Sequence, residues 1–331
     1  MTKELSTKIS NAGLVCACLV VLLHSPIGTR PQSLLWWCNR MGPDGIGYVA
    51  VPMFFVISGW FLAGHMGEDG WWKREVCKRV ASLLVPMVVW CGLWYACELA
   101  LGLKSFTFQS LVSAVGLNPF SGLEIGPLWY VRQLFIMVVL APILIRVANI
   151  PSLFVLMILN ILWIVFGGKH DINYLIRTEG VVAFVFGLFL RKDNISLNIS
   201  ARRGAVFFAL ALCLLALRNL SVGNGQVYWF VNELAIVALV PGVWAFIPTR
   251  PVFGGLVRFS FPIYVLHTVV YRAFEVMVPG GSLLRFAVMT VCAFVLPCVI
   301  AAVCQAYTPT LGRILFGGRC TRECRRSVEV K

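Results

Sequence analysis

Long apolar segments separated by short polar connections run along almost the whole chain. Most of these segments are about 17–25 residues long, the length of α-helix that crosses the hydrocarbon core of a bilayer. The pattern therefore predicts an all-α fold, a polytopic transmembrane helix bundle of about ten spans. The predicted spans cover residues 10–27, 46–64, 80–102, 127–148, 150–167, 176–190, 204–220, 227–247, 254–277 and 283–307.

The composition excludes a soluble globular protein. Of the 331 residues, 59% are hydrophobic and only 13% are charged, and the mean hydropathy is +0.85. Soluble domains carry about 45–50% apolar and about 25% charged residues, so the natural solvent of this chain is a lipid bilayer. No internal repeat interrupts the pattern. We predict a single integral membrane domain over residues 1–331, with a short basic tail from about residue 312.

The net charge of +14 indicates membrane orientation rather than a nucleic-acid partner. Lysines and arginines of membrane proteins collect in cytoplasmic loops. With the N-terminus inside and an even number of spans, most of the 28 basic residues fall on the cytoplasmic side. We therefore predict that both termini are cytoplasmic. Cys320 and Cys324 form an isolated pair in the tail, which is too little for a metal site, and we predict no metal.

Two histidines lie within predicted spans, where an ionisable group costs about 2.5–3.5 kcal/mol. His24 lies about 20 Å of helix beyond Asn11, and His267 about 18 Å beyond Gly255, so both are expected at similar depth. Two imidazoles at one level can share a proton or hold one substrate. The alternatives are a helix-end histidine bonded to a nearby carbonyl for His24 and a packing histidine for His267.

Arg132 and Arg272 are two further cations in predicted spans. A guanidinium there needs an anion, a set of carbonyl groups or water, and an outer polar cavity that receives substrate would supply these. The alternative is that each side chain extends to the outer interface. Trp129 and Tyr130, next to Arg132, fit a substrate site or an interfacial aromatic belt.

Ser58 and Gly59 form a small pair within the second predicted span. Small residues let another helix, or a thin ligand, approach the backbone closely. After this span comes a basic cluster on the predicted cytoplasmic side. It would hold the phosphates of a donor molecule or anionic lipid headgroups, and it consists of Lys73, Arg74, Lys78 and Arg79.

Five motifs, in this order, resemble the acyltransferase family 3 membrane proteins over nearly the whole chain. Many members are O-acetyltransferases that act on bacterial surface glycans. The motifs are Val20–His24, Val51–Gly59, Lys78–Arg79 with Leu84–Pro86, Gly126–Tyr130 with Ala141–Pro142, and Ile263–His267. The chain departs from the family at Gly13, where members commonly carry an arginine.

The resemblance implies a membrane O-acyltransferase of the bacterial inner membrane. Acetyl-CoA would be the donor and co-substrate, and a glycan or lipid-linked glycan at the outer face the acceptor. His24 would act as general base or carry the acyl group briefly, and His267 and Arg132 would orient it or stabilise the oxyanion. The basic cluster (Lys73, Arg74, Lys78 and Arg79) and Ser58 would bind the donor, and Trp129, Tyr130 and Arg272 the acceptor.

Two other functions remain open from the sequence. The same histidines would serve a proton or substrate path in a transporter of a glycan, lipid or small metabolite. A catalytically decayed member acting as a scaffold or sensor is the second alternative. Binding of acetyl-CoA and release of free thiol distinguish an acyltransferase from a transporter, whereas removal of His24 should leave the phenotype of a scaffold or sensor unchanged.

Overall fold

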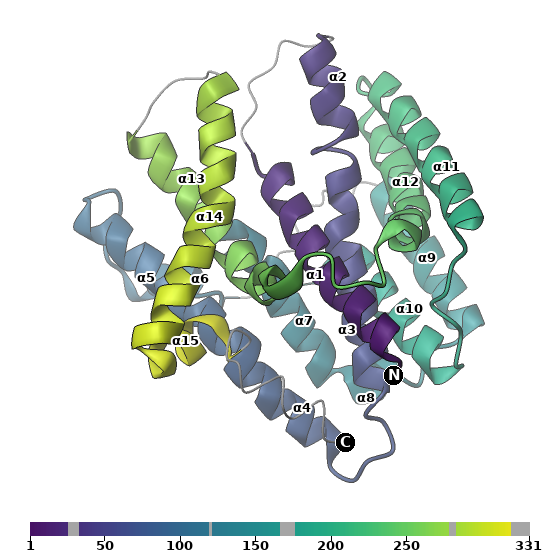
Figure 1. Cartoon of the computed structure of the whole chain (residues 1–331), viewed down its shortest axis with the longest axis horizontal. Coiled ribbons are helices and arrows are strands. Elements are labelled where there is room, and N and C mark those ends of the chain that lie inside the picture. Colours follow the sequence, from purple (N-terminus) through teal and green to yellow (C-terminus); the bar gives the residue numbers. More distant parts are fainter. Residues whose placement is uncertain (26–32, 119–120, 166–175, 278–282, 319–331) are drawn as a thin grey trace. The chain divides into compact units, whose positions relative to one another are not determined.

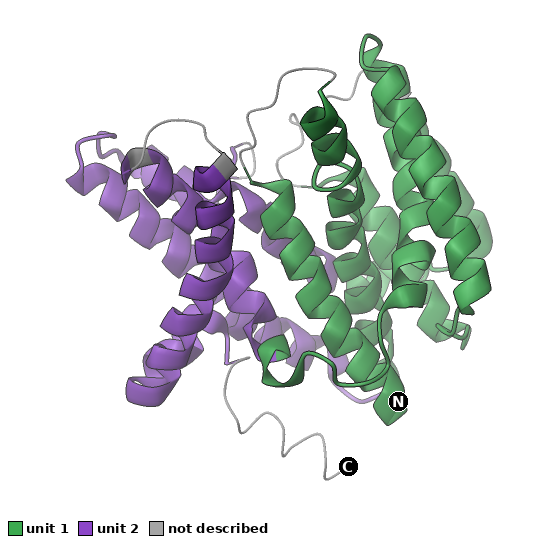
Figure 2. Cartoon of the chain, turned by 45° about the horizontal axis from the view of Figure 1, so that its top comes forward, with its two compact units in different colours: residues 1–67, 141–257 green, residues 68–140, 258–331 purple. Residues whose placement is uncertain are grey.

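The computed structural model describes residues 1–25, 33–118, 121–165, 176–277 and 283–318 (Figure 1). Within these ranges the secondary structure is entirely helical, which confirms the predicted all-α class. The chain divides into two compact units (Figure 2). The first unit contains residues 1–67 and 141–257, and the second contains residues 68–140 and 258–331.

The helices of the first unit come from both ends of its sequence. They are α1 (Lys3–Leu23), α2 (Leu34–Met41), the 3₁₀ helix η1 (Ile46–Val49), α3 (Ala50–Ala63), α8 (Ala141–Leu144), α9 (Ile150–Val165), α10 (Thr178–Lys192), α11 (Ala201–Leu220) and α12 (Gly225–Phe246). The last two pack side by side along their length (Figure 1).

Helix α1 begins earlier than its apolar residues predict, at Lys3 rather than residue 10. The hydroxyl of Thr2 accepts a hydrogen bond from the backbone N–H of Leu5 at 3.3 Å and so caps the helix. Glu4, in the first turn, suits the positive end of the helix dipole. The helix stops at Leu23, so His24 caps its C-terminal end instead of lying inside a span.

Helices α3 and α10 approach each other through two glycines. A Cβ added at Gly59 would lie 2.2 Å from the carbonyl oxygen of Phe184, and one added at Gly187 would lie 2.1 Å from that of Val56. Any side chain at either position would separate the two backbones. The small pair Ser58-Gly59 therefore serves helix packing through Gly59, which was one of the two interpretations of this motif.

The second unit contains the remaining helices. They are α4 (Trp71–Arg79), the π-helical turn η2 (Val80–Leu84), α5 (Val85–Ala100), α6 (Phe108–Ala114), the 3₁₀ helix η3 (Gly126–Leu128), α7 (Trp129–Val139), α13 (Ser260–Met277), α14 (Leu283–Tyr307) and α15 (Pro309–Phe316). The 3₁₀ helix η4 (Gly254–Phe259) leads into α13. Helix α14 has the predicted bounds of 283–307.

One long helix includes residues 71–79, which the hydrophobic pattern predicted to lie in a connection. Trp71–Ala100 forms one apolar helix of 30 residues, which includes α4, the π turn and α5. The π turn lies just before Pro86, which has no N–H to donate to the carbonyl one turn earlier. The basic cluster on α4 is consequently helical, which corrects its predicted position in a connection.

The fourth predicted span, residues 127–148, is not one continuous helix. It consists of part of η3, then α7 and α8, with a break at Leu140. Pro142 lacks the N–H that would continue the helix across this break. The sequence analysis also missed three short helices, α2, α6 and α15.

Six helices are long and apolar enough to cross a membrane, among the described residues. They are Lys3–Leu23, Leu34–Ala63, Trp71–Ala100, Ala201–Leu220, Gly225–Phe246 and Leu284–Tyr307. A multi-pass helical membrane protein is therefore confirmed, whereas ten spans, cytoplasmic termini and a single domain stay predictions. Most of the predicted basic tail, from Arg319 onward with Cys320 and Cys324, lies outside the described residues.

Candidate active site

His24 presents an exposed imidazole at the end of α1. Its Nδ1 lies 2.9 Å from the carbonyl oxygen of Val20, one turn earlier. Because a carbonyl oxygen only accepts hydrogen bonds, Nδ1 carries the proton and Nε2 carries the lone pair. The ring thus has the helix-end geometry that we considered as the alternative to a catalytic role. The same bond also fixes the tautomer in which Nε2 acts as a base.

His267 also forms a hydrogen bond from Nδ1 to a backbone carbonyl oxygen, but it is buried where His24 is exposed. It is fully buried in α13, and its Nδ1 donates to the carbonyl oxygen of Tyr264 at 2.7 Å. Its Nε2 then accepts a hydrogen bond from the hydroxyl of Thr268 at 3.1 Å. The rings of Tyr264 and Tyr271 lie on either side, with centroids 6.1 and 6.3 Å away. Both ring nitrogens are engaged by the helix itself, which favours a packing role.

Tyr264 connects His267 to the start of α7. Its ring meets that of Tyr130 edge to face, with centroids 5.8 Å apart, and its hydroxyl donates to the carbonyl oxygen of Pro127. Tyr130 is buried and Trp129 is half-buried. The structure thus brings Tyr130 close to the His267 region, while acceptor binding by Trp129 and Tyr130 stays a prediction.

Arg132 is buried among backbone carbonyl groups. Its Nη1 lies 3.4 Å from each of the carbonyl oxygens of Gly116, Asn118 and Ser121, in the segment after α6. Its exposed fraction is 4%. The set of carbonyl groups considered from the sequence is therefore present. Oxyanion binding by Arg132 stays a prediction.

Arg272 belongs to a network of four charged residues in the second unit. Its Nη1 lies 3.6 Å from Glu98 and 3.7 Å from Glu124, and Lys104 contacts the same two carboxylates at 2.9 and 2.6 Å. The Arg272 guanidinium also lies over the ring of Trp94, 5.7 Å from its centroid. An acceptor bound at Arg272, as the sequence predicts, would therefore contact a guanidinium group that already lies near two carboxylates.

Lys104 lies in the connection between α5 and α6, outside the spanning helices. Burial opposes its charge, but the hydrogen bonds and charges of Glu124 and Glu98 outweigh this and raise the pKa of Lys104 above its ordinary value. The ammonium group is thus the form that holds the network together.

Most of the basic cluster on α4 is paired with acids. The Arg74 guanidinium bonds to Glu68, and Lys78 and Arg79 lie 3.4 and 3.3 Å from the buried Glu75. Lys73 is exposed, with no ion pair to a described acid. The two acids reduce the positive field that the sequence suggested, and donor binding here stays a prediction, as it does for the half-buried Ser58.

A buried arginine that the sequence analysis did not single out anchors the first unit. Arg218, in α11, is fully buried and donates to the carbonyl oxygens of Arg40 and Asp44 at 2.6 and 2.7 Å. It also donates to the side chains of Asn232 at 2.9 Å and Asn219 at 3.0 Å. Its place near the end of an apolar helix was the only available signal, because its partners are far away in sequence.

The candidate residues fall into both units. His24 and Ser58 belong to the first, and the remaining candidates, including His267, Arg132 and the α4 cluster, belong to the second. Pairing of the two histidines therefore stays a prediction. Within the second unit, the structure groups Tyr130 with His267 through Tyr264, and Arg272 with Glu98, Glu124 and Lys104.

The long apolar helices define a multi-pass membrane protein. The acyltransferase 3 family model, described as an acyltransferase domain, matches residues 14–302. The chain belongs to this family, which confirms the resemblance over nearly its whole length and supports membrane acyltransfer as its general activity. Searches of curated proteins and of solved structures gave no significant match.

Proposed function

We propose that the protein transfers an acetyl group from cytoplasmic acetyl-CoA to a hydroxyl group of a glycan or other envelope acceptor outside a bacterial inner membrane. Membership of the acyltransferase family supports the reaction class. The observation that carries the proposal is the exposed ring of His24, whose Nδ1 is held by the Val20 carbonyl so that Nε2 has the basic lone pair.

In this proposal His24 acts as the general base. Its Nε2 takes the proton of the acceptor hydroxyl while the hydroxyl oxygen attacks the thioester carbonyl carbon. The carbon–sulfur bond breaks, and the departing CoA thiolate takes the proton from Nε2. The Val20 carbonyl supports the cationic ring between these steps, because its hydrogen bond strengthens when the imidazole becomes charged.

The other candidates have supporting roles in the proposal. Lys73 and its neighbours on α4, together with Ser58, would bind the donor, and Trp129, Tyr130 and Arg272 would bind the acceptor. Arg132 is the candidate for stabilising the oxyanion, whereas His267, whose two ring nitrogens are hydrogen-bonded within α13, would act only through packing. Each of these assignments is separate from that of His24.

The test uses inside-out membrane vesicles from the native host and acetyl-CoA labelled in the acetyl group. Wild type should transfer label to envelope material and release free thiol, and His24→Gln should do neither. His65→Gln is the matched control, because His65 lies after α3 and has no proposed role. Equal transfer by wild type and His24→Gln, with both proteins folded and inserted, would remove His24 from the reaction.

The donor requires a separate measurement. Binding of acetyl-CoA to purified wild type should be detectable by calorimetry, and binding should survive in His24→Gln because this residue acts on the acceptor. A wild-type protein that neither binds acetyl-CoA nor releases thiol would contradict the proposed donor and favour transport.

A further inference from the structure

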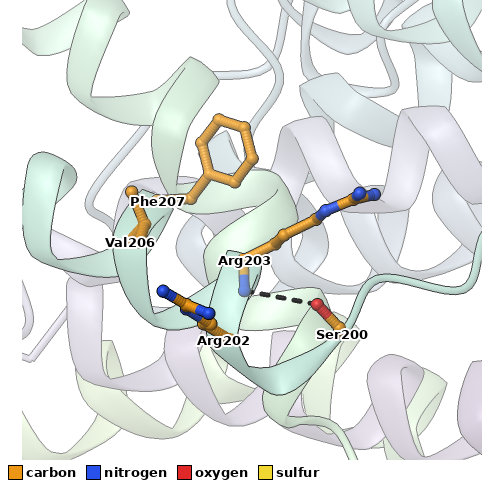
Figure 3. Close-up of a pocket in the computed structure, with 5 residues that line it drawn as sticks. All are labelled: Ser200, Arg202, Arg203, Val206 and Phe207. Carbon is orange, nitrogen blue, oxygen red and sulfur yellow. Dashed lines mark hydrogen bonds between the residues drawn. The ribbon is translucent and has the colours of Figure 1, made fainter.

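An open pocket with a volume of about 360 Å³ lies at the first turn of α11 (Figure 3). Ser200 accepts a hydrogen bond from the backbone N–H of Arg203 and so caps the helix. Arg202 and Arg203 are exposed, and neither forms an ion pair with an acid among the described residues. The lining residues are Ser200, Arg202, Arg203, Val206 and Phe207.

This pocket differs from the basic cluster on α4 in its charge. Arg74, Lys78 and Arg79 all contact glutamates, whereas the pocket contains two guanidinium groups and no acid. The two guanidinium groups extend in different directions from the first turn of α11 (Figure 3), so each side of the opening carries a positive charge that attracts an anion. Guanidinium groups match phosphate oxygens especially well, since their N–H groups form paired hydrogen bonds.

The apolar part of the pocket indicates which phosphate compound fits. Val206 and Phe207 are 65% and 41% exposed. The same face of α11 continues with exposed Leu210, Cys213 and Leu217, at helical spacing. The opposite face is buried and includes Gly204, Ala211 and Leu215.

This arrangement matches the two parts of a phospholipid. Helix α11 is among those long and apolar enough to cross a membrane, so its exposed face is suited to contact with acyl chains. The two arginines stand where that face begins, which is the place of a lipid headgroup. A soluble phosphate would use the arginines but would leave the apolar stripe without a partner.

We propose that this pocket binds an anionic phospholipid. Arg202 and Arg203 attract its phosphate group from the two sides of the opening, and Val206 and Phe207 contact the first part of its acyl chains. The site is independent of the proposed acetyl transfer, since it uses none of the residues assigned to that reaction.

Native mass spectrometry of the full chain in detergent tests the site, with phosphatidylglycerol as the probe and phosphatidylcholine as the neutral comparison. Arg202→Gln/Arg203→Gln should weaken phosphatidylglycerol binding by roughly 10–30-fold, and Arg202→Gln alone should give an intermediate loss. The matched control, Lys3→Gln/Arg250→Gln, removes the same charge from exposed positions of the first unit. It should change binding by less than about threefold.

Three results would overturn the proposal. The first is unchanged phosphatidylglycerol binding by the double variant, and the second is an equal loss in the matched control, which would show a general charge effect. The third comes from soluble CoA as a second probe. If the double variant loses CoA binding but retains phosphatidylglycerol, the arginines serve a soluble phosphate compound instead.

Discussion

His24 in the first unit and His267 in the second form the same kind of hydrogen bond to their own helix, but their surroundings differ. In each, Nδ1 donates to a carbonyl oxygen three or four residues earlier. The helix ends at His24 and the ring is exposed, whereas His267 is fully buried and its Nε2 accepts from Thr268. The hydrogen bond that fixes a tautomer is therefore no sign of catalysis by itself. The exposure of the histidine residue separates a candidate base from a packing residue.

Replacing each histidine by glutamine tests this comparison directly and should give the largest effect. His24→Gln should lower kcat for acetyl transfer by about 10²–10⁴-fold, because a general base contributes that much, with little change in Tm. His267→Gln should instead lower Tm, since it disturbs the hydrogen bonds of a fully buried residue, and should reduce kcat by less than about tenfold. Labelled transfer and thermal unfolding in detergent provide the two readouts.

The opposite pattern would break the comparison. If His267→Gln abolished transfer at an unchanged Tm, the buried histidine would act in the reaction, as the family resemblance suggested. His65→Gln provides the baseline for both measurements, as it removes an imidazole from a connection.

The buried arginines of the two units should differ in their contribution to stability. Arg218 donates over 2.6–3.2 Å to four residues, whereas Nη1 of Arg132 lies 3.4 Å from each of three carbonyl oxygens. Arg218→Met should therefore reduce the free energy of unfolding by about 3 kcal/mol or more, and Arg132→Met by about 1–2 kcal/mol. Unfolding midpoints in detergent measure both, and a larger loss in Arg132→Met would contradict the ranking.

The apolar pattern predicted helix positions well, because burial in lipid requires long continuous segments. The bounds of α14 match the prediction, and those of α12 differ from it by two residues at the start and one at the end. The errors arise where polar or proline chemistry sets the boundary. The cap at Thr2 extends α1, and the missing N–H of Pro142 accompanies the break after α7. Both signals were present in the sequence but lay outside the hydrophobic pattern.

The candidate site was predictable only as a list of residue types. The sequence identified His24 and Arg132 as unusual, but it contained no information on the bond of His24 to Val20 or the carbonyl groups around Arg132. Arg218 shows the limit most clearly, because its bond to Asp44 joins residues 174 positions apart. Such long-range contacts decide whether a polar residue in a span is satisfied by structure or is accessible for chemistry.

The α4 cluster extends the comparison to donor binding, with a smaller expected effect. Lys73 is exposed and pairs with no described acid, whereas Lys78 shares Glu75 with Arg79. Lys73→Gln should raise KM for acetyl-CoA by about two- to fivefold, more than Lys78→Gln, because an exposed charge contributes up to about 1 kcal/mol. Steady-state kinetics with Arg250→Gln as control measures this. An unchanged KM in both variants would remove the cluster from the donor site.

The smallest effect concerns the alkaline stability of the second unit and tests whether its charged network is structural. Glu124 and Glu98 raise the pKa of Lys104, so the folded state holds this proton more tightly than the unfolded state does. The stabilisation is therefore complete below the unfolded pKa of about 10.4 and is lost as pH rises through the folded pKa. Between about pH 9 and 11.5, Tm should fall more in wild type than in Lys104→Met, which lacks the proton. Parallel pH profiles would show that the network contributes no measurable stability, leaving Arg272, its other cation, as a candidate for acceptor binding.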